Sequence, residues 1–379
     1  MRATRAEGIG SRGRHLDKRS RDVERRESCP NGTPAHQQDH ILRAQGTGQV
    51  SFDAVLIVAF GGPQGTADVR PFLANVLRGR RVAPGRVEEV AHHYDLFDGV
   101  SPLTELTMRQ ADMLRGRLHD RGVPLPVYVG MRNWHPFLAD TLAEMSRAGV
   151  RRAVGFIAAA QRSYSSCTQY RENVEAARAT LRDGGLADVE VVYVGDWHTH
   201  PGFIEANADH VREALQKLPA TVRDRARLVF TAHSIPVSMA ERYPYQRQLE
   251  ETARAVSACA ARSFSSSSRD WALVYQSRSG RPEDPWLGPD VCDYLREEAA
   301  RGLLSAVLAP IGFLCDHIEV LYDLDVEAAA VCREARLPMV RARSVNDHPR
   351  FADTMADVVL ETVERYAAGR PLSIVGSST

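Results

Sequence analysis

Short apolar runs recur along the chain from Phe52 onward, and between them apolar residues repeat every three or four positions. The short runs are almost continuously apolar, which is typical of parallel strands that are buried on both faces of a sheet. The stretches between them have the period of amphipathic helices. Strands that alternate with helices predict an α/β fold built on doubly wound, parallel sheets. We expect strands at Ala54–Phe60, Leu125–Gly130, Arg152–Ala159, Val189–Val194, Ala226–Ala232, Trp271–Gln276 and Ser305–Phe313.

The number of strands suggests how the chain is divided. About eight strands would form two sheets of about four each, and 379 residues are many for one domain. We therefore predict one domain at residues 51–200, a second at 201–345, and a helix at 346–370 that packs back on the body. The helical pattern is clearest at Leu106–His119, Arg171–Leu181, Ala206–Gln216, Tyr245–Arg262, Pro289–Arg301 and Arg350–Ala367.

Composition narrows the range of partners and compartments. Residues 1–50 are rich in Arg, Gly and acidic residues and poor in apolar ones, so we expect them to be disordered. The net charge is zero, which gives no support to a nucleic-acid partner. The chain has no run of about 18 apolar residues, so no transmembrane segment is expected. With no secretory signal and widely spaced cysteines, we predict a cytoplasmic protein.

A histidine stands at the expected carboxyl end of one strand. In open parallel sheets, ligands bind beyond the carboxyl ends of the strands. His233 directly follows the expected strand Ala226–Ala232 and precedes a turn toward Pro236, which directs it into such a crevice. An imidazole there can accept a proton or bind a metal near neutral pH. Position alone equally allows a structural histidine.

Acidic residues follow the last predicted strand. Glu319, Asp323 and Glu327 are spaced four apart, so on a helix they share one face, with Asp316 beside them. A solvated acidic face at a helix start is one interpretation. The position directly after a strongly apolar strand favours another, in which the carboxylates line the crevice. Oxygen and imidazole ligands together suit a divalent first-row metal such as iron.

Loops near several strand ends combine aromatic, hydroxyl and guanidinium groups. That mixture suits a large, planar, anionic ligand, although ordinary surface loops have a similar composition. The loop Gly61–Gly65 lacks the spacing of a phosphate-binding loop, and Pro63 lacks an N–H donor, which disfavours a nucleotide-binding enzyme. The candidate positions are Tyr94, Ser101–Leu103, Met131–Pro136, Tyr164–Tyr170 and Tyr275–Arg278.

Taken together, the longer motifs resemble the ferrochelatase family in order and spacing. The resemblance covers roughly residues 52–365. It implies two similar Rossmann-like domains with a porphyrin cleft between them, and an enzyme that inserts ferrous iron into the porphyrin. The motifs are Thr231–Pro236, Tyr275–Gly280 with Pro285–Leu287, Pro310–Phe313 leading into Asp316–Asp325, and, in the amino-terminal part, Leu56–Pro63 and Gly99–Leu103.

The resemblance also assigns roles to individual residues. It implies that His233 and Glu319 form the insertion site and that Asp323 and Glu327 continue a carboxylate path for the metal. It leaves open which of His233 and Glu319 is base and which is ligand. Phe60 stands where some members have a tyrosine that reaches the metal, and it has no oxygen to donate. The positions expected to contact the porphyrin are Ser101, Tyr170, Tyr94 and Phe60.

Two segments, Met131–Pro136 and Tyr164–Arg171, are similar to the actinobacterial branch of the family. That branch is associated with coproporphyrin III, which gives coproheme in haem synthesis, and protoporphyrin IX is the alternative substrate. Some of its members hold a [2Fe-2S] cluster, and Cys167 resembles the internal ligand. No cysteine follows Cys332, so we expect no such cluster here. Ferrous iron is then a substrate, and no organic cofactor is expected.

Other functions remain open from the sequence alone. A related chelatase could load cobalt or nickel into another tetrapyrrole, because the order of metal affinities does not select iron. A non-catalytic haem or porphyrin carrier would bind the ring but would need no base such as His233. Transient contacts with other enzymes of haem synthesis are compatible with either an enzyme or a carrier.

Overall fold

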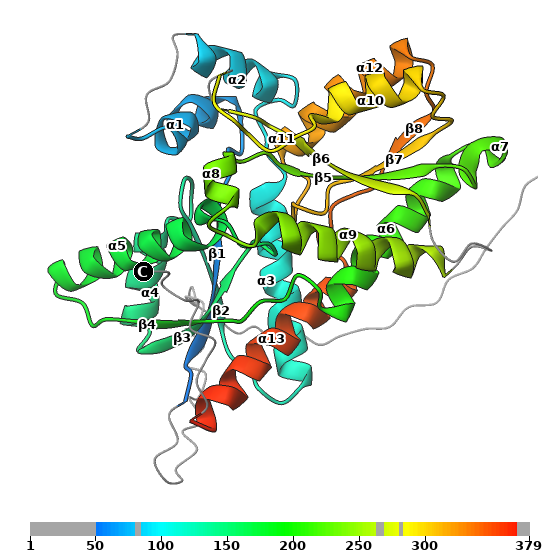
Figure 1. The fold of residues 1–379 in the computed structure, drawn as a ribbon. Coiled ribbons are helices and arrows are strands. Elements are labelled where there is room, and N and C mark those ends of the chain that lie inside the picture. The colour runs from blue at the N-terminus through cyan, green and yellow to red at the C-terminus, as the bar shows by residue number, and fades with distance from the viewer. Residues whose placement is uncertain (1–50, 80–84, 263–268, 280–282, 370–379) are drawn as a thin grey trace, which may run out of the picture. The chain divides into compact units, whose positions relative to one another are not determined.

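The computed structural model describes residues 51–79, 85–262, 269–279 and 283–369, so the expected disorder of residues 1–50 lies outside the described residues. Its first sheet is parallel and four-stranded, in the order β2-β1-β3-β4 (Figure 1). The central strand β1 is buried along its whole length, as its continuous apolar sequence predicts. The strands are β1 Ala54–Ala59, β2 Val127–Met131, β3 Arg152–Ile157 and β4 Glu190–Tyr193.

The second sheet repeats the first. It is also parallel and four-stranded, in the order β6-β5-β7-β8, so each strand takes the place of the strand four earlier in the chain. The strand order reverses between β1 and β3 in one sheet and between β5 and β7 in the other, which are the points where ligands bind in such folds. The predicted α/β class with two parallel sheets is confirmed. The strands are β5 Arg227–His233, β6 Trp271–Gln276, β7 Ala306–Ala309 and β8 Met339–Arg341.

The predicted last strand, Ser305–Phe313, is too long. Strand β7 ends at Ala309, because Pro310 has no amide hydrogen to donate to a neighbouring strand. The amide of Gly312 donates instead to the carbonyl of Thr231, at 3.1 Å, and turns the chain across the end of β5. The eighth strand, β8, has only three half-buried residues, so it produced no apolar run that could be located in the sequence.

Helices connect the strands and cover the sheets (Figure 1). Two segments are π-helical, with one extra residue in each hydrogen-bonded turn. The α-helices are α1 Thr66–Val76, α2 Arg86–Asp95, α3 Leu103–Asp120, α4 Leu138–Arg147, α5 Gln169–Asp183, α6 Pro201–Lys217, α7 Ala220–Arg223, α8 Val237–Ala240, α9 Tyr245–Ala261, α10 Val291–Ala300, α11 Ile318–Val320, α12 Ala329–Glu334 and α13 Pro349–Ala367, and the π-helices are η1 Tyr164–Thr168 and η2 Leu321–Ala328.

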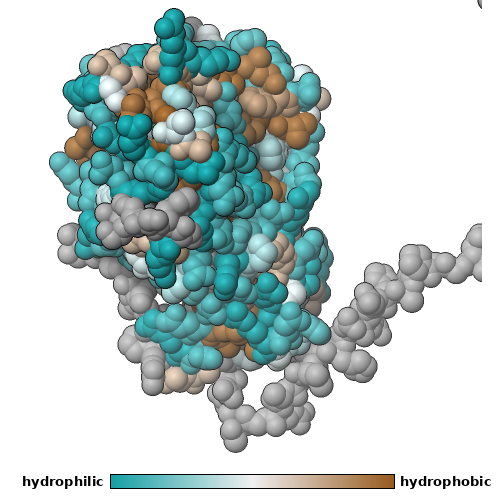
Figure 2. All heavy atoms as spheres, turned by 90° about the vertical axis from the view of Figure 1, so that its right-hand side faces the viewer, coloured by the Kyte–Doolittle hydropathy of each residue, from teal (hydrophilic) through white to brown (hydrophobic). Residues whose placement is uncertain are grey.

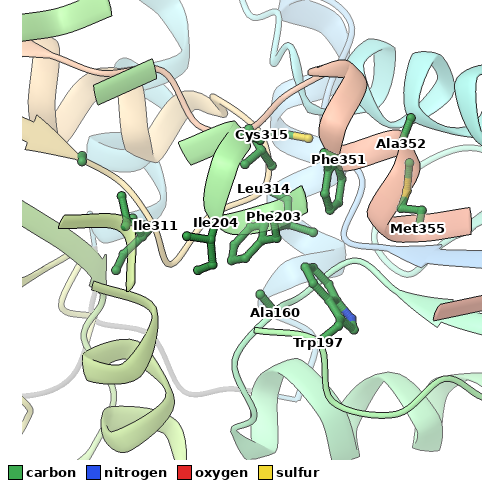
Figure 3. Close-up of a cluster of buried hydrophobic side chains, with 14 of the residues drawn as sticks. Ala160, Trp197, Phe203, Ile204, Ile311, Leu314, Cys315, Phe351, Ala352 and Met355 are labelled. Carbon is green, nitrogen blue, oxygen red and sulfur yellow. The ribbon is translucent and has the colours of Figure 1, made fainter. Parts of the chain in front are cut away.

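A continuous hydrophobic core joins the two sheets. Figure 3 shows a part of it, where Phe203 of α6, Phe351 of α13 and Trp197 from the loop after β4 lie together. The rings of Trp197 and Phe351 are 5.7 Å apart between centroids. The last helix, α13, packs against α3, α6 and β3. Because the core runs through both sheets, the predicted division at residue 200 stays a prediction.

The surface is mainly polar. Figure 2 shows a face on which hydrophilic residues predominate and apolar ones are gathered mainly toward its upper part. Among the described residues, no helix combines the length and the apolar character needed to cross a bilayer.

Candidate active site

His233 is the last residue of β5, and a network of hydrogen bonds fixes its position. Its Nδ1 lies 2.5 Å from the carbonyl oxygen of Ser234, and its own carbonyl accepts a bond from the hydroxyl of Tyr245 at 3.0 Å. The amide of Ser234 donates to the carbonyl of Gln276 on β6. A carbonyl can only accept, so Nδ1 carries the proton and Nε2 has the free lone pair. The ring therefore presents a basic nitrogen at the carboxyl end of the sheet.

Glu319 faces that nitrogen from the connection that follows the neighbouring strand. It lies on α11, in the connection that follows β7, and its Oε2 is 3.9 Å from Nε2 of His233. The His233 side chain is 34% exposed and that of Glu319 is 49% exposed, so both are open to a ligand. Protein nitrogen and oxygen ligands bind a metal at about 2.0–2.2 Å, so one ion fits between these two atoms. The predicted pairing of His233 with Glu319 thus agrees with the geometry.

The acidic residues beyond Glu319 lie on a π-helix rather than on the expected α-helix. In η2 the wider turn keeps Asp323 on the side of Glu319, and Gln276 links the two residues. The Gln276 Nε2 donates to Oδ2 of Asp323 at 3.1 Å and approaches the backbone carbonyl of Glu319 at 3.5 Å. Ser277, whose φ of 58° is left-handed, donates its hydroxyl to the same carboxylate. Such a conformation is uncommon for a residue other than glycine.

The carboxyl group of Asp323 is poised to change protonation near neutral pH. Burial raises its pKa to about 7, and the negative charges of Glu319 and Glu327 add to the rise, while the bonds from Ser277 and Gln276 oppose it. Partial burial also raises the pKa of Glu327, with smaller contributions from Asp290. Carboxylates that repel one another in this way attract a cation, because a cation relieves the repulsion.

Asp323 and Glu327 open into one pocket with a volume of about 370 Å³. The opposite wall is α2, whose His93 stacks on Tyr322 with ring centroids 3.6 Å apart. No pattern in the sequence indicated this wall, because α2 carries charged and polar residues on most of its surface and its contact with η2 is made only in three dimensions. The pocket is lined by Arg86, Glu89, His92, His93, Gln276, Ser277, Arg278, Asp290, Val291, Cys292, Tyr322, Asp323 and Glu327.

Asp316 does not belong to this acidic face, contrary to our expectation. It precedes α11 and is buried, and its carboxylate accepts bonds from Arg341 at 2.9 Å and from the side chain of Asn346 at 2.8 Å. Burial alone would raise its pKa, but Arg341 and these bonds hold the pKa below its usual range. Asp316 is therefore a structural anion that ties the start of α11 to the loop after β8.

The loop after β1 approaches Ser101 closely. Ser101 is buried, and its amide donates to the carbonyl of Pro63 at 2.9 Å. The hydroxyl of Thr104 donates to the carbonyl of Gly62 at 3.1 Å. A Cβ at Gly62 would lie 2.8 Å from the Cβ of Ser101, closer than two such atoms can approach. The glycine therefore allows the two loops to pack together.

We expect Gly62→Ala to lower the free energy of unfolding by about 1–3 kcal/mol, because the added methyl group overpacks the contact with Ser101. Urea unfolding measures the change. Gly65→Ala is the matched control, because a Cβ there meets no atom within 4 Å. Equal stability of the two variants would contradict this packing.

Arg132 brings two of the predicted ligand contacts together. Its guanidinium lies over the ring of Phe60, 5.6 Å from the centroid, and over that of Tyr170, 5.3 Å away. The Tyr170 ring is buried, which raises the pKa of its hydroxyl to about 12. Gln169 accepts a bond from Arg132 at 2.9 Å. The sequence pointed to the segment Met131–Pro136 but did not single out Arg132.

Tyr94 lies in a separate hydrophobic cluster. Its ring is buried beside Phe72, with centroids 5.9 Å apart, and Ile318 of α11 packs into the same cluster. Burial raises the pKa of Tyr94 far above its usual value. The structure thus places Tyr94 next to the acidic segment, and its predicted contact with a ligand stays a prediction.

Cys167 is the residue that resembles a cluster ligand of the actinobacterial branch. It lines a small cavity of about 40 Å³ and, among the described residues, is the only cysteine that does so; the cavity wall also contains Arg162 and Arg171. A [2Fe-2S] cluster is held by four protein ligands, usually thiolates. The described residues of this cavity do not form such a set, and the expected absence of a cluster stays a prediction.

Comparison with known proteins points to one family. The sequence profile described as ferrochelatase matches residues 52–363. The chain is 46% identical to a coproporphyrin III ferrochelatase of Streptomyces coelicolor over 82% of this chain and 85% of the relative. It is also 46% identical to a ferrochelatase of Rhodopirellula baltica, over 82% and 86%. A coproporphyrin III ferrochelatase of Mycobacteroides abscessus is 43% identical, over 84% and 90%.

Among solved structures, SirB from Bacillus subtilis with Fe³⁺ is similar in fold, with a TM-score of 0.53. The likeness covers 84% of this chain and 99% of that chain, at 10% sequence identity. At that identity it supports the arrangement of the two sheets and nothing more specific.

Proposed function

Because the chain belongs to the ferrochelatase family, as the motifs indicated, we propose that it inserts ferrous iron into coproporphyrin III to give coproheme. The observation that carries the proposal is the pair His233 and Glu319, 3.9 Å apart at the carboxyl ends of β5 and the β7 connection. The relatives named as coproporphyrin III ferrochelatases support the choice of porphyrin.

Insertion of the metal must remove two pyrrole protons from the porphyrin. We assign the first proton to Nε2 of His233, because Nδ1 is held by the carbonyl of Ser234 and only Nε2 has a free lone pair. Glu319, within 3.9 Å, takes up this proton from Nε2, so that His233 can accept the second pyrrole proton. A base placed in this way contributes about 10²–10⁴-fold to the rate.

The carboxylates of Asp323 and Glu327 carry the iron to that pair, or carry protons away from it. Both line the pocket of about 370 Å³, together with Glu89 and Asp290. Oxygen ligands of this kind bind a divalent cation without trapping it as firmly as thiolates would. Gln276 donates a hydrogen bond to Asp323 and lies close to the Glu319 carbonyl, so it holds these two residues beside each other.

The porphyrin ring binds against the first sheet in this proposal. Ser101 and Tyr170 lie at its carboxyl edge, and Arg132 lies against Tyr170. A porphyrin with propionate groups matches a wall that combines aromatic faces with a guanidinium. We place the ring between this wall and His233.

The substrate choice is tested by anaerobic Fe²⁺ insertion with coproporphyrin III and protoporphyrin IX in parallel, followed by absorbance. We expect kcat/KM to be higher with coproporphyrin III. Its additional propionates can accept hydrogen bonds from polar groups of the protein, whereas the vinyl groups of protoporphyrin IX cannot. A preference for protoporphyrin IX would overturn the substrate assignment and keep the family and the site.

A metal-competition arm separates this proposal from a chelatase for another metal. Co²⁺ and Ni²⁺ are offered with Fe²⁺ at equal concentrations under the same anaerobic conditions. We expect iron to be inserted in preference, and a clear preference for cobalt or nickel would contradict the assignment of iron.

A further inference from the structure

A second, smaller cavity lies at the carboxyl ends of β3 and β4, away from His233. Its volume is about 40 Å³, room for only a few water-sized groups. A cavity of that size excludes a porphyrin or a nucleotide. The wall is formed by Gly155, Ile157, Ala159, Ala160, Arg162, Cys167, Arg171, Tyr193, Val194, Gly195, Asp196 and Trp197.

Two positively charged side chains, those of Arg162 and Arg171, line this wall. The guanidinium of Arg171 lies over the ring of Tyr193, 4.5 Å from its centroid. The same ring packs on Gly155 of β3, where a Cβ would lie 2.7 Å from Cδ1 of Tyr193. Tyr193 therefore contacts both the backbone of β3 and the guanidinium of Arg171.

Three hydrogen-bond donors of the wall have no partner. The Nε of Arg162, the Nε of Arg171 and the hydroxyl of Tyr193 are buried, and none of them bonds to any described residue. Buried donors in folded proteins are nearly always bonded to protein, water or a ligand. Three donors without partners around one cavity indicate an acceptor inside it.

The charge balance of the wall favours an anionic acceptor. Asp196 is the only acidic residue among those lining the cavity, and it is already bonded to Arg162 at 3.3 Å and to Gln248 at 3.2 Å. Within the described part of the chain, no carboxylate forms an ion pair with Arg171. The positive charge of Arg171 is therefore available to an anionic ligand.

We propose that this cavity binds a small oxyanion, of the class of inorganic phosphate, sulfate or bicarbonate, through Arg162, Arg171 and Tyr193. The oxygens of such an anion accept bonds from all three donors, and its charge pairs with Arg171. The site is separate from the metal-insertion residues and does not rest on the proposed iron insertion.

The half-buried thiol of Cys167 lines the cavity and reports on its occupancy. The full chain is treated with iodoacetamide while phosphate, sulfate or bicarbonate is titrated against chloride at constant ionic strength. Mass spectrometry follows alkylation of the Cys167 peptide. At an anion concentration about ten times the Kd, about one site in eleven is free, so alkylation slows about tenfold. Cys292, also half-buried but outside this cavity, should react at an unchanged rate.

Variants identify the residues that hold the anion. Arg171→Gln should abolish the protection of Cys167, and Tyr193→Phe, which removes only the hydroxyl, should weaken it. Arg182→Gln, on the same helix but paired with Asp188 outside the cavity, should keep it. The oxyanion with the lowest half-saturating concentration identifies the preferred ligand. The proposal is overturned if no oxyanion protects Cys167, if chloride protects it equally, or if Arg171→Gln is protected as well as the natural chain.

Discussion

His233→Ala should lower kcat for iron insertion by about 10²–10⁴-fold, because it removes the base that accepts the pyrrole proton. The fold should survive, since the Nε2 side of the ring is open to solvent. The backbone bonds of His233 with Tyr245 and of Ser234 with Gln276 do not depend on the imidazole. Initial rates of coproheme formation under saturating porphyrin and Fe²⁺ measure the effect, and thermal unfolding checks the fold.

The matched control is His119→Ala, which removes a histidine whose side chain is 78% exposed. Its rate should equal that of the natural chain. If His233→Ala folded normally and inserted iron at a near-normal rate, His233 would not be the base. If it lost porphyrin binding as well as turnover, the residue would hold the ring rather than its protons.

Asp323→Asn should stabilise the protein at alkaline pH and should raise the KM for Fe²⁺. The carboxyl pKa is raised from 3.8 to about 7, so the folded state holds a proton that the unfolded chain releases. Between these two values stability falls as the pH rises, and the full cost of the buried charge is present only above about pH 7. The variant lacks this charge and should be more stable at pH 8 by on the order of 1–3 kcal/mol, since each pKa unit corresponds to about 1.4 kcal/mol before solvent screening. Near pH 4 the gain should disappear.

The same change removes one negative charge from the path of the metal. We expect the KM for Fe²⁺ to rise about tenfold, the equivalent of about 1.4 kcal/mol of lost attraction. Urea unfolding at pH 4 and pH 8, with initial rates over a series of Fe²⁺ concentrations, measures both effects. Asp140→Asn, an exposed carboxylate on α4, is the control and should change neither. A loss of stability at pH 8, or an unchanged KM for iron, would contradict the role given to Asp323.

The order of strands and helices could be predicted because buried parallel strands give short, almost continuously apolar runs in the sequence. The carboxyl ends of β5 and β7 lie side by side, so His233 and Glu319 could be expected in one crevice before their distance was known. That inference needs only the strand order and the position of each residue after its strand.

The path beyond Glu319 could not be predicted in the same detail. An interval of four residues fits one face of an α-helix and also lies close to the wider turn of the π-helix η2. Asp316 has the same side chain as Asp323, yet its carboxylate is neutralised by Arg341, a residue far along the chain. The contact of His93 with Tyr322 and that of Arg132 with Phe60 and Tyr170 likewise join segments that no local pattern relates.

Repeated turnover is the property that most directly separates a ferrochelatase from a porphyrin carrier. The decisive measurement is anaerobic coproheme formation with Fe²⁺ and coproporphyrin III in large excess over the protein. We predict many equivalents of coproheme for each protein molecule, at a rate that is proportional to protein concentration and depends on His233. Tight binding of the porphyrin with no metallation above the rate in buffer, or with at most one equivalent formed, would contradict catalysis by this chain.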